Sequence, residues 1–95
     1  MDSNSMREIS KTIDRIKSND KSAYAKDGTN YQNSHKVNPN SERLNTSNTY
    51  KEWTVKTPNI GGRGQRRIVI NNQTKQAYYT HDHYNSFIEI DLKGW

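Results

Sequence analysis

Four side chains in the second half of the chain carry the chemistry of proton transfer and anion binding. A carboxylate, two guanidinium groups and an imidazole follow one another as Glu52, Arg63, Arg67 and His83, at separations of 11, 4 and 16 residues. A carboxylate and an imidazole have reference pKa values of about 4.3 and 6.5, so near pH 5 to 6 one is ionised and the other protonated. Arginine stays charged, and its planar fork donates two hydrogen bonds to a phosphate. These residue types supply a base, an acid and two cations for an anionic reaction centre.

The segments around these four residues predict an antiparallel sheet. Short runs rich in β-branched and aromatic residues alternate with turn-forming residues, which is typical of strands joined by tight connections. The predicted strands are Glu52–Lys56, Arg67–Ile70, Ala77–Thr80 and Phe87–Ile90. Successive side chains of a strand point to opposite faces, so Glu52 and Arg67 are expected on the face away from Trp53 and Ile68. A polar cleft is therefore expected on that face.

The first half of the chain predicts one helix followed by long polar loops. Ile9, Ile13 and Ile16 recur at helical spacing, and Ser5 can serve as the N-cap, so the helix is expected over residues 6–19 and residues 1–5 are expected to be disordered. Residues 20–49 are rich in Asn and Ser and are expected to form substrate-binding loops, because long ordered loops in small domains usually shape a site.

Length and composition set the fold class. The chain has 95 residues and a mass of 11.1 kDa, which is one domain, expected to span residues 1–95. Ile, Leu, Val and Phe number fourteen, of which nine lie in residues 51–95, so the core must be built mainly by the second half. We expect an α+β fold in which one N-terminal helix packs on a four- to five-stranded antiparallel sheet within residues 50–92.

Charge and composition indicate which classes of partner the chain can bind. Fifteen Lys and Arg against ten Asp and Glu give a net charge of +5, which favours anionic partners. The chain has no cysteine and hence no disulfide or thiolate metal site. It has no apolar run of about 18 residues and no signal-peptide pattern at its start, so we expect a soluble protein that does not act at a membrane.

Three segments resemble the small microbial ribonucleases that include barnase and the guanyl-specific streptomycete enzymes. They are Tyr50–Val55, Gly62–Val69 and Tyr78–Phe87, and Tyr24–Asn33 is similar to the family's segment leading into the base-recognition loop. The family's Glu, Arg, Arg, His order maps onto Glu52, Arg63, Arg67 and His83. Taken singly, Glu52, Arg63 or Arg67 would more often be an ordinary surface charge, but the joint occurrence of the four residues at the family spacing favours a catalytic set. The resemblance covers about Tyr24 to Ile90 and implies a barnase-like fold.

The resemblance implies a metal-independent endoribonuclease that needs no cofactor and cleaves single-stranded RNA by transphosphorylation. Glu52 would take the 2′-hydroxyl proton, His83 would protonate the departing oxygen, and the arginines would stabilise the phosphorane charge. DNA should bind but not be cut, because the nucleophile is the 2′-hydroxyl of RNA. The expected substrate-binding residues are Tyr31, Gln32, Asn33, Ser34, His35 and Tyr84. Tyr31 and Tyr84 fit core aromatics equally well.

One departure from the family pattern concerns base choice. The family usually has a Glu two places after the loop's Asn, where it accepts hydrogen bonds from guanine. This chain has His35 there, two places after Asn33. A neutral imidazole accepts at most one hydrogen bond, so guanine preference is expected to be weakened. The connection from Pro39 to Tyr50 also looks a few residues longer than in the streptomycete enzymes.

Two other interpretations stay open at this point. The His81-Asp82-His83 run could be half of a metal site, but it lacks a nearby third ligand, and no metal is expected. A non-catalytic basic RNA-binding module would explain the charge and the aromatic residues. It gives no reason for Glu52 beside the arginines, because a carboxylate repels phosphate.

The biological setting is an expectation drawn from the same features. A cysteine-free nuclease with a polar start and no secretion signal looks like the C-terminal toxin domain of an interbacterial polymorphic toxin, with a secreted extracellular guanyl-preferring ribonuclease as the alternative. Either would be secreted or delivered into a target-cell cytoplasm. The producing cell would need protection, so an acidic inhibitor or immunity protein is expected as a partner beside the RNA substrate. The enzyme itself is expected to be a monomer.

Overall fold

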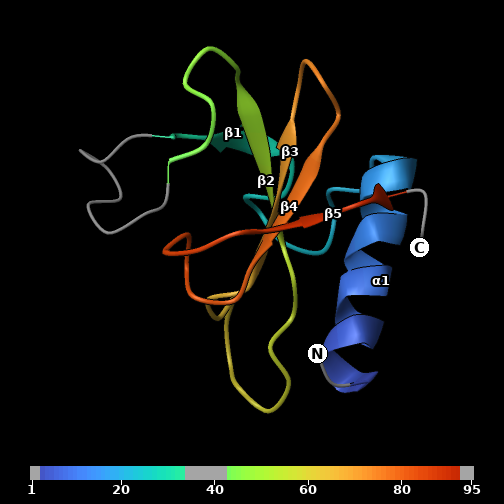
Figure 1. Ribbon diagram of the computed structural model, residues 1–95. Helices are drawn as coiled ribbons and strands as arrows, with labels where there is room; N and C mark the ends of the chain where they lie inside the picture. The colour runs from blue at the N-terminus through green and yellow to red at the C-terminus, as the bar shows by residue number, and fades with distance from the viewer. Residues whose placement is uncertain (1–2, 34–42, 93–95) are drawn as a thin grey trace.

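A computed structural model describes residues 3–33 and 43–92 and places one helix against one face of a twisted sheet (Figure 1). The helix α1 spans Ser3–Ser18. The strands are β1 Thr29–Tyr31, β2 Tyr50–Thr54, β3 Arg67–Asn71, β4 Ala77–Thr80 and β5 Ile88–Ile90. They pair antiparallel in the order β1-β2-β3-β4-β5, each with its neighbour in sequence. The predicted α+β fold with a helix on an antiparallel sheet is confirmed.

The helix differs from the prediction at its start. It begins at Ser3, so the expectation that residues 3–5 are disordered is wrong, and Ser5 is not the N-cap. The side chain of Ser5 instead turns toward the sheet, where Arg66 Nη1 donates to Ser5 Oγ at 3.2 Å. Residues 1 and 2 lie outside the described residues.

The helix ends where its sequence allows a left-handed residue. Asn19 has a φ of 54°, and two backbone bonds close the turn, from Asn19 N to Ile16 O at 3.1 Å and from Asp20 N to Arg15 O at 2.8 Å. This pairing is the Schellman pattern, in which the residue after the helix takes the left-handed conformation. Asparagine tolerates that conformation better than most side chains do.

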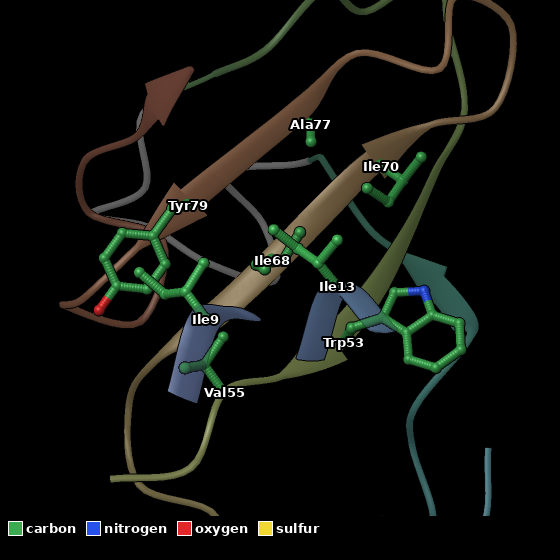
Figure 2. Packing of buried hydrophobic residues seen from close by; sticks show 8 residues of the cluster. All are labelled: Ile9, Ile13, Trp53, Val55, Ile68, Ile70, Ala77 and Tyr79. Carbon is green, nitrogen blue, oxygen red and sulfur yellow. The ribbon is translucent and has the colours of Figure 1, made fainter. Parts of the chain in front are cut away.

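The core lies between the helix and the sheet, as the alternation of the strands predicts. Figure 2 shows Ile9 and Ile13 of the helix packed with side chains from β2, β3 and β4. The buried cluster consists of Ile9, Ile13, Trp53, Val55, Ile68, Ile70, Ala77 and Tyr79. In the described part of the chain, no helix is long and apolar enough to cross a membrane.

The opposite face of the sheet carries a second, smaller cluster that sequence reasoning did not anticipate as a unit. It contains Tyr31, Tyr50, Val69 and Tyr84, with Leu44, Tyr78 and Phe87 packed against it. The strand β1 was also missed, because its three residues lie within a run of polar residues predicted to be loop. It pairs with β2 in a register that sets Thr29 opposite Glu52.

Candidate active site

The antiparallel order of the strands gathers several connections at one end of the sheet. In such a meander the connections β2–β3 and β4–β5 leave from the same end, and the segment that enters β1 reaches the sheet there too. Arg63 lies in the first connection and His83 in the second. Two residues 20 positions apart in the sequence are thereby brought to the same edge of the polar face.

The carboxylate of Glu52 is held by Arg63. Arg63 Nη2 donates to Glu52 Oε1 at 3.1 Å, and Arg63 Nε donates to Thr54 Oγ1 at 3.0 Å. Both side chains are partly accessible, with 13% exposure for Glu52 and 29% for Arg63. The pair is therefore open to an incoming ligand while its geometry is fixed by β2.

The loop that carries Arg63 depends on a glycine. Gly64 has a φ of +64°, and a Cβ there would lie 2.5 Å from Thr57 Oγ1. A larger residue would be strained by both the backbone conformation and the lack of space. Gly64 thus lets the loop fold back tightly next to Arg63.

Arg67 lies on the predicted face of the sheet but is buried behind the site. It is 2% exposed, and its Nη1 donates to the carbonyls of Arg66 at 2.8 Å and Arg63 at 3.4 Å. Burial, and then the charge of Arg63, lowers the pKa of Arg67, although an arginine remains charged in proteins. The expectation that Arg67 lines an open cleft is therefore wrong, because its side chain lies buried against the carbonyls of Arg63 and Arg66 and interacts with Tyr84.

His83 is presented by a strained turn. His83 and Tyr84 have φ values of 54° and 76°, a conformation that non-glycine residues adopt rarely. Two amides pin the turn: His83 N donates to Gln65 O at 3.0 Å, and Tyr84 N donates to Thr80 Oγ1 at 3.0 Å. Such strain persists only where surrounding contacts hold it, and it is common at functional sites.

A carboxylate completes the support of this turn. Asp82 accepts hydrogen bonds from the Thr80 hydroxyl at 2.8 Å and from the amide and hydroxyl of Ser86 at 3.0 and 2.8 Å. Burial alone would raise the pKa of Asp82, but the hydrogen bonds from Ser86 and Thr80 outweigh it and lower the pKa. Asp82 thus stabilises the turn through hydrogen bonds. His81 is exposed, and among residues 3–33 and 43–92 no three metal-ligating side chains cluster.

The electrostatic surroundings of His83 favour its neutral form in the free protein. Burial and then Arg67 lower the pKa of His83 below the ordinary imidazole value, Arg63 acts in the same direction, and Glu52 partly opposes them. A bound phosphate would act like Glu52 and favour the protonated form.

The two tyrosines belong both to the second cluster and to the site. Tyr31 and Tyr84 are 5% and 4% exposed, and their ring centroids lie 4.5 Å apart at a tilt of 35°. The His83 ring lies 4.8 Å from that of Tyr84. Burial, followed by the charge of Glu52, raises the pKa of Tyr84, so its hydroxyl stays protonated. Both tyrosines are thus core aromatics, and both also line the pocket that contains Glu52, while their contact with substrate stays a prediction.

Asn33 is the last described residue at the start of the predicted base-recognition loop, and its side chain joins the two ends of that loop. Its Nδ2 donates to Leu44 O at 2.8 Å, and Leu44 N donates to its Oδ1 at 3.0 Å, so the side chain bridges the two ends of the loop. The side-chain amide is therefore occupied by the protein itself. Ser34 and His35, the other predicted residues of this loop, lie outside the described residues.

A single pocket of about 240 Å³ collects most of the predicted residues. Its lining comprises Glu52, Arg63, His83, Tyr84, Tyr31 and Gln32, together with Lys26 and Asn30. Arg67 and Asn33 are not among the lining residues. Lys26 and Asn30 were not predicted individually, although both lie in the family-like segment Tyr24–Asn33; recognising β1 as a partner of β2 would have placed both near Glu52.

Comparisons with known proteins agree with this fold. The family described as ribonuclease matches residues 2–91 of the chain, and the chain belongs to that family. It is 38% identical over 84 residues to guanyl-specific ribonuclease Sa of Kitasatospora aureofaciens, covering 88% of this chain and 83% of the relative. It is 35% identical over 80 residues to guanyl-specific ribonuclease St of Saccharopolyspora erythraea, covering 84% of this chain and 74% of that protein.

A solved structure shares the architecture. Ribonuclease Sa2, determined in complexes with mononucleotides, superposes with a TM-score of 0.74 at 31% identity, covering 90% of this chain and 83% of that one. The predicted membership in the guanyl-specific microbial ribonuclease family is thus confirmed.

Proposed function

We propose that this protein is a metal-independent endoribonuclease that cleaves single-stranded RNA by transphosphorylation. The observation that carries the proposal is the single pocket in which Glu52, Arg63 and His83 meet, with the buried Arg67 near enough for its charge to act on His83. A carboxylate, an imidazole and two guanidinium groups are the groups that such a reaction needs. Membership in the ribonuclease family supports the same reaction class.

In the first step the Glu52 carboxylate accepts the proton of the ribose 2′-hydroxyl, and the 2′-oxygen attacks phosphorus. The P–O5′ bond breaks as protonated His83 gives its proton to the departing 5′-oxygen. The products are a 2′,3′-cyclic phosphate and a free 5′-hydroxyl. Arg63 and Arg67 stabilise the additional negative charge of the phosphorane. In the slower second step water takes the place of the 5′-oxygen, with the two groups exchanging roles.

The test is cleavage of a ribodinucleoside monophosphate in the presence and absence of EDTA, with the products separated by chromatography. The proposal expects a 2′,3′-cyclic phosphate that forms first and is hydrolysed later, at a rate that EDTA leaves unchanged. The 2′-deoxy analogue should remain intact. Cleavage of the deoxy analogue, or a linear 3′-phosphate with no cyclic intermediate, would contradict the mechanism.

We further propose that the protein acts as the toxin domain of an interbacterial polymorphic toxin and is neutralised by an acidic immunity protein. The net charge of +5 and the cationic pocket support an acidic partner, because opposite charges accelerate association. A partner carboxylate would stand in for the scissile phosphate beside Arg63.

The test uses the product of the gene next to the one that encodes this protein. It should inhibit cleavage, associate more slowly as salt is raised, and lose affinity on Arg63→Ala or with competing mononucleotide. A neighbouring gene product that binds with an affinity insensitive to all three changes would place the interface elsewhere. A neighbouring gene product that does not bind would favour the secreted extracellular enzyme.

A further inference from the structure

Lys26 brings an additional positive charge to the pocket that contains Glu52 and His83. It lines the same pocket and its side chain is exposed. Within the described ranges Lys26 takes part in no ion pair. Its ammonium group is therefore available to a ligand in that pocket.

The backbone that carries Lys26 is fixed on both sides. The amide and hydroxyl of Thr29 donate to Lys26 O at 3.1 and 2.6 Å, and Gly28 N donates to Glu52 O at 2.8 Å. The next residue, Asp27, accepts a hydrogen bond from Thr54 N at 2.8 Å and is 2% exposed. Gly28 has a φ of +78°, so this turn also needs its glycine. Lys26 is thereby anchored beside the catalytic strand, and only its side chain remains free to adapt.

Neither arginine of the site offers an exposed cation that is not already paired. Arg63 is already paired with Glu52, and Arg67 is 2% exposed. RNA carries one negative charge per phosphate, and binding through phosphates is dominated by lysine and arginine contacts. Lys26 is an exposed cation, in no ion pair with any residue that the structure describes, at the end of the sheet where Arg63 and His83 lie, away from the β1–β2 connection that holds Asn33.

We propose that Lys26 is a substrate-binding residue that contacts a phosphate of the RNA backbone, an inference that rests on the proposed ribonuclease activity. The phosphate is either the scissile one or a neighbour along the strand. Both have the same chemistry, and substrates of different length distinguish them. The role is electrostatic, so an arginine should replace the lysine and a glutamine should not.

The experiment compares wild type with Lys26→Gln and Lys26→Arg, using Lys17→Gln on the exposed side of α1 as the control with the same loss of charge. The substrates are a ribodinucleoside monophosphate, which has only the scissile phosphate, and the same compound extended by a 5′- or a 3′-phosphate. For each combination of enzyme variant and substrate, kcat and KM are measured over a range of salt concentrations. Thermal unfolding checks that the variants remain folded.

Lys26→Gln is expected to lower kcat/KM about 5- to 10-fold at low salt, while Lys26→Arg retains most of the wild-type value and Lys17→Gln stays near it. The slope of log kcat/KM against log salt should also become shallower, because one contact between opposite charges, which salt screens, is lost. If Lys26→Gln lowers kcat/KM on the dinucleoside monophosphate itself, Lys26 contacts the scissile phosphate. If it lowers kcat/KM only on an extended substrate, Lys26 contacts the neighbouring phosphate.

An unchanged kcat/KM and salt slope for Lys26→Gln on all three substrates would overturn the inference. A loss that Lys17→Gln reproduces, or that Lys26→Arg does not restore, would also overturn it. Wild type that cleaves none of the substrates would instead refute the proposed function, so the two failures are distinguishable.

Discussion

Replacing Asp27 with alanine is expected to destabilise the fold strongly. The carboxylate of Asp27 has no exposed surface and joins three elements. It accepts a hydrogen bond from Arg15 Nη1 of α1 at 3.0 Å and from the Thr54 amide at the end of β2 at 2.8 Å. Arg15 Nη2 also donates to Thr54 O at 2.6 Å, so helix, turn and strand share one buried polar network.

The magnitude follows from the groups left behind. Removing one partner of a buried ion pair costs about 3 to 5 kcal/mol, and an unpaired buried amide costs about 1 to 3 kcal/mol. Arg15 is 17% exposed and keeps its bonds to Thr54 O and Thr12 Oγ1, which favours the lower end of the first range. The expected loss for Asp27→Ala is therefore about 4 to 6 kcal/mol. That is a large part of the stability of a typical small domain, about 5 to 15 kcal/mol.

Urea unfolding followed by tryptophan fluorescence measures this loss. Asp14→Ala serves as the control, because Asp14 is an exposed acidic residue on α1, and its replacement should change stability by less than about 0.5 kcal/mol. If Asp27→Ala unfolds too readily for a baseline, Asp27→Asn, which can still accept from the Thr54 amide, gives a smaller, measurable loss. A loss below about 1 kcal/mol for Asp27→Ala would refute the reasoning.

Three further outcomes are expected. Burial and the neighbouring arginine charges lower the pKa of His83, so the alkaline limb of the kcat/KM profile should lie below pH 6.5. Arg63→Gln removes a cation that opposes protonation and should move that limb to higher pH; a move to lower pH would contradict this assignment. Thr80→Val leaves the Tyr84 amide unpaired and should cost about 1 to 3 kcal/mol in urea unfolding and lower kcat, whereas Thr80→Ser should preserve both. His35→Glu should raise the ratio of kcat/KM for GpA over ApA by about 10- to 150-fold, and a wild type already strictly selective for guanine would show that another acceptor makes the contact.

Much of the fold could be predicted because its signals are local. The spacing of Ile9, Ile13 and Ile16 identifies the helix, and alternation around Trp53 and Ile68 identifies two strands and their buried face (Figure 2). The strand β1 could not be predicted in the same way. Its three residues Thr29–Tyr31 have no apolar alternation, and only pairing with the distant β2 makes them a strand.

The site was predictable only where the family pattern marks it. Glu52, Arg63 and His83 are recognised by their order and spacing, and the structure brings them into one pocket. The burial of Arg67 could not be foreseen from strand parity, which gives the face of the sheet but not what covers it. Lys26 lies in the family-like segment Tyr24–Asn33, but nothing in that segment singles it out, because its position beside Glu52 arises from β1 pairing and from the hydrogen bond between Gly28 N and Glu52 O.

The most direct test of the central claim is the kcat/KM of folded His83→Ala, relative to wild type, on two substrates with different leaving groups. The mechanism predicts a loss of about 100- to 10,000-fold on a ribodinucleoside monophosphate, whose 5′-oxygen needs a proton to depart. On a guanosine 3′-(4-nitrophenyl phosphate), whose leaving group needs no proton, the loss should be much smaller. Near-normal turnover of the dinucleoside by His83→Ala, or equal losses on both substrates, would contradict the assignment of His83 as the general acid.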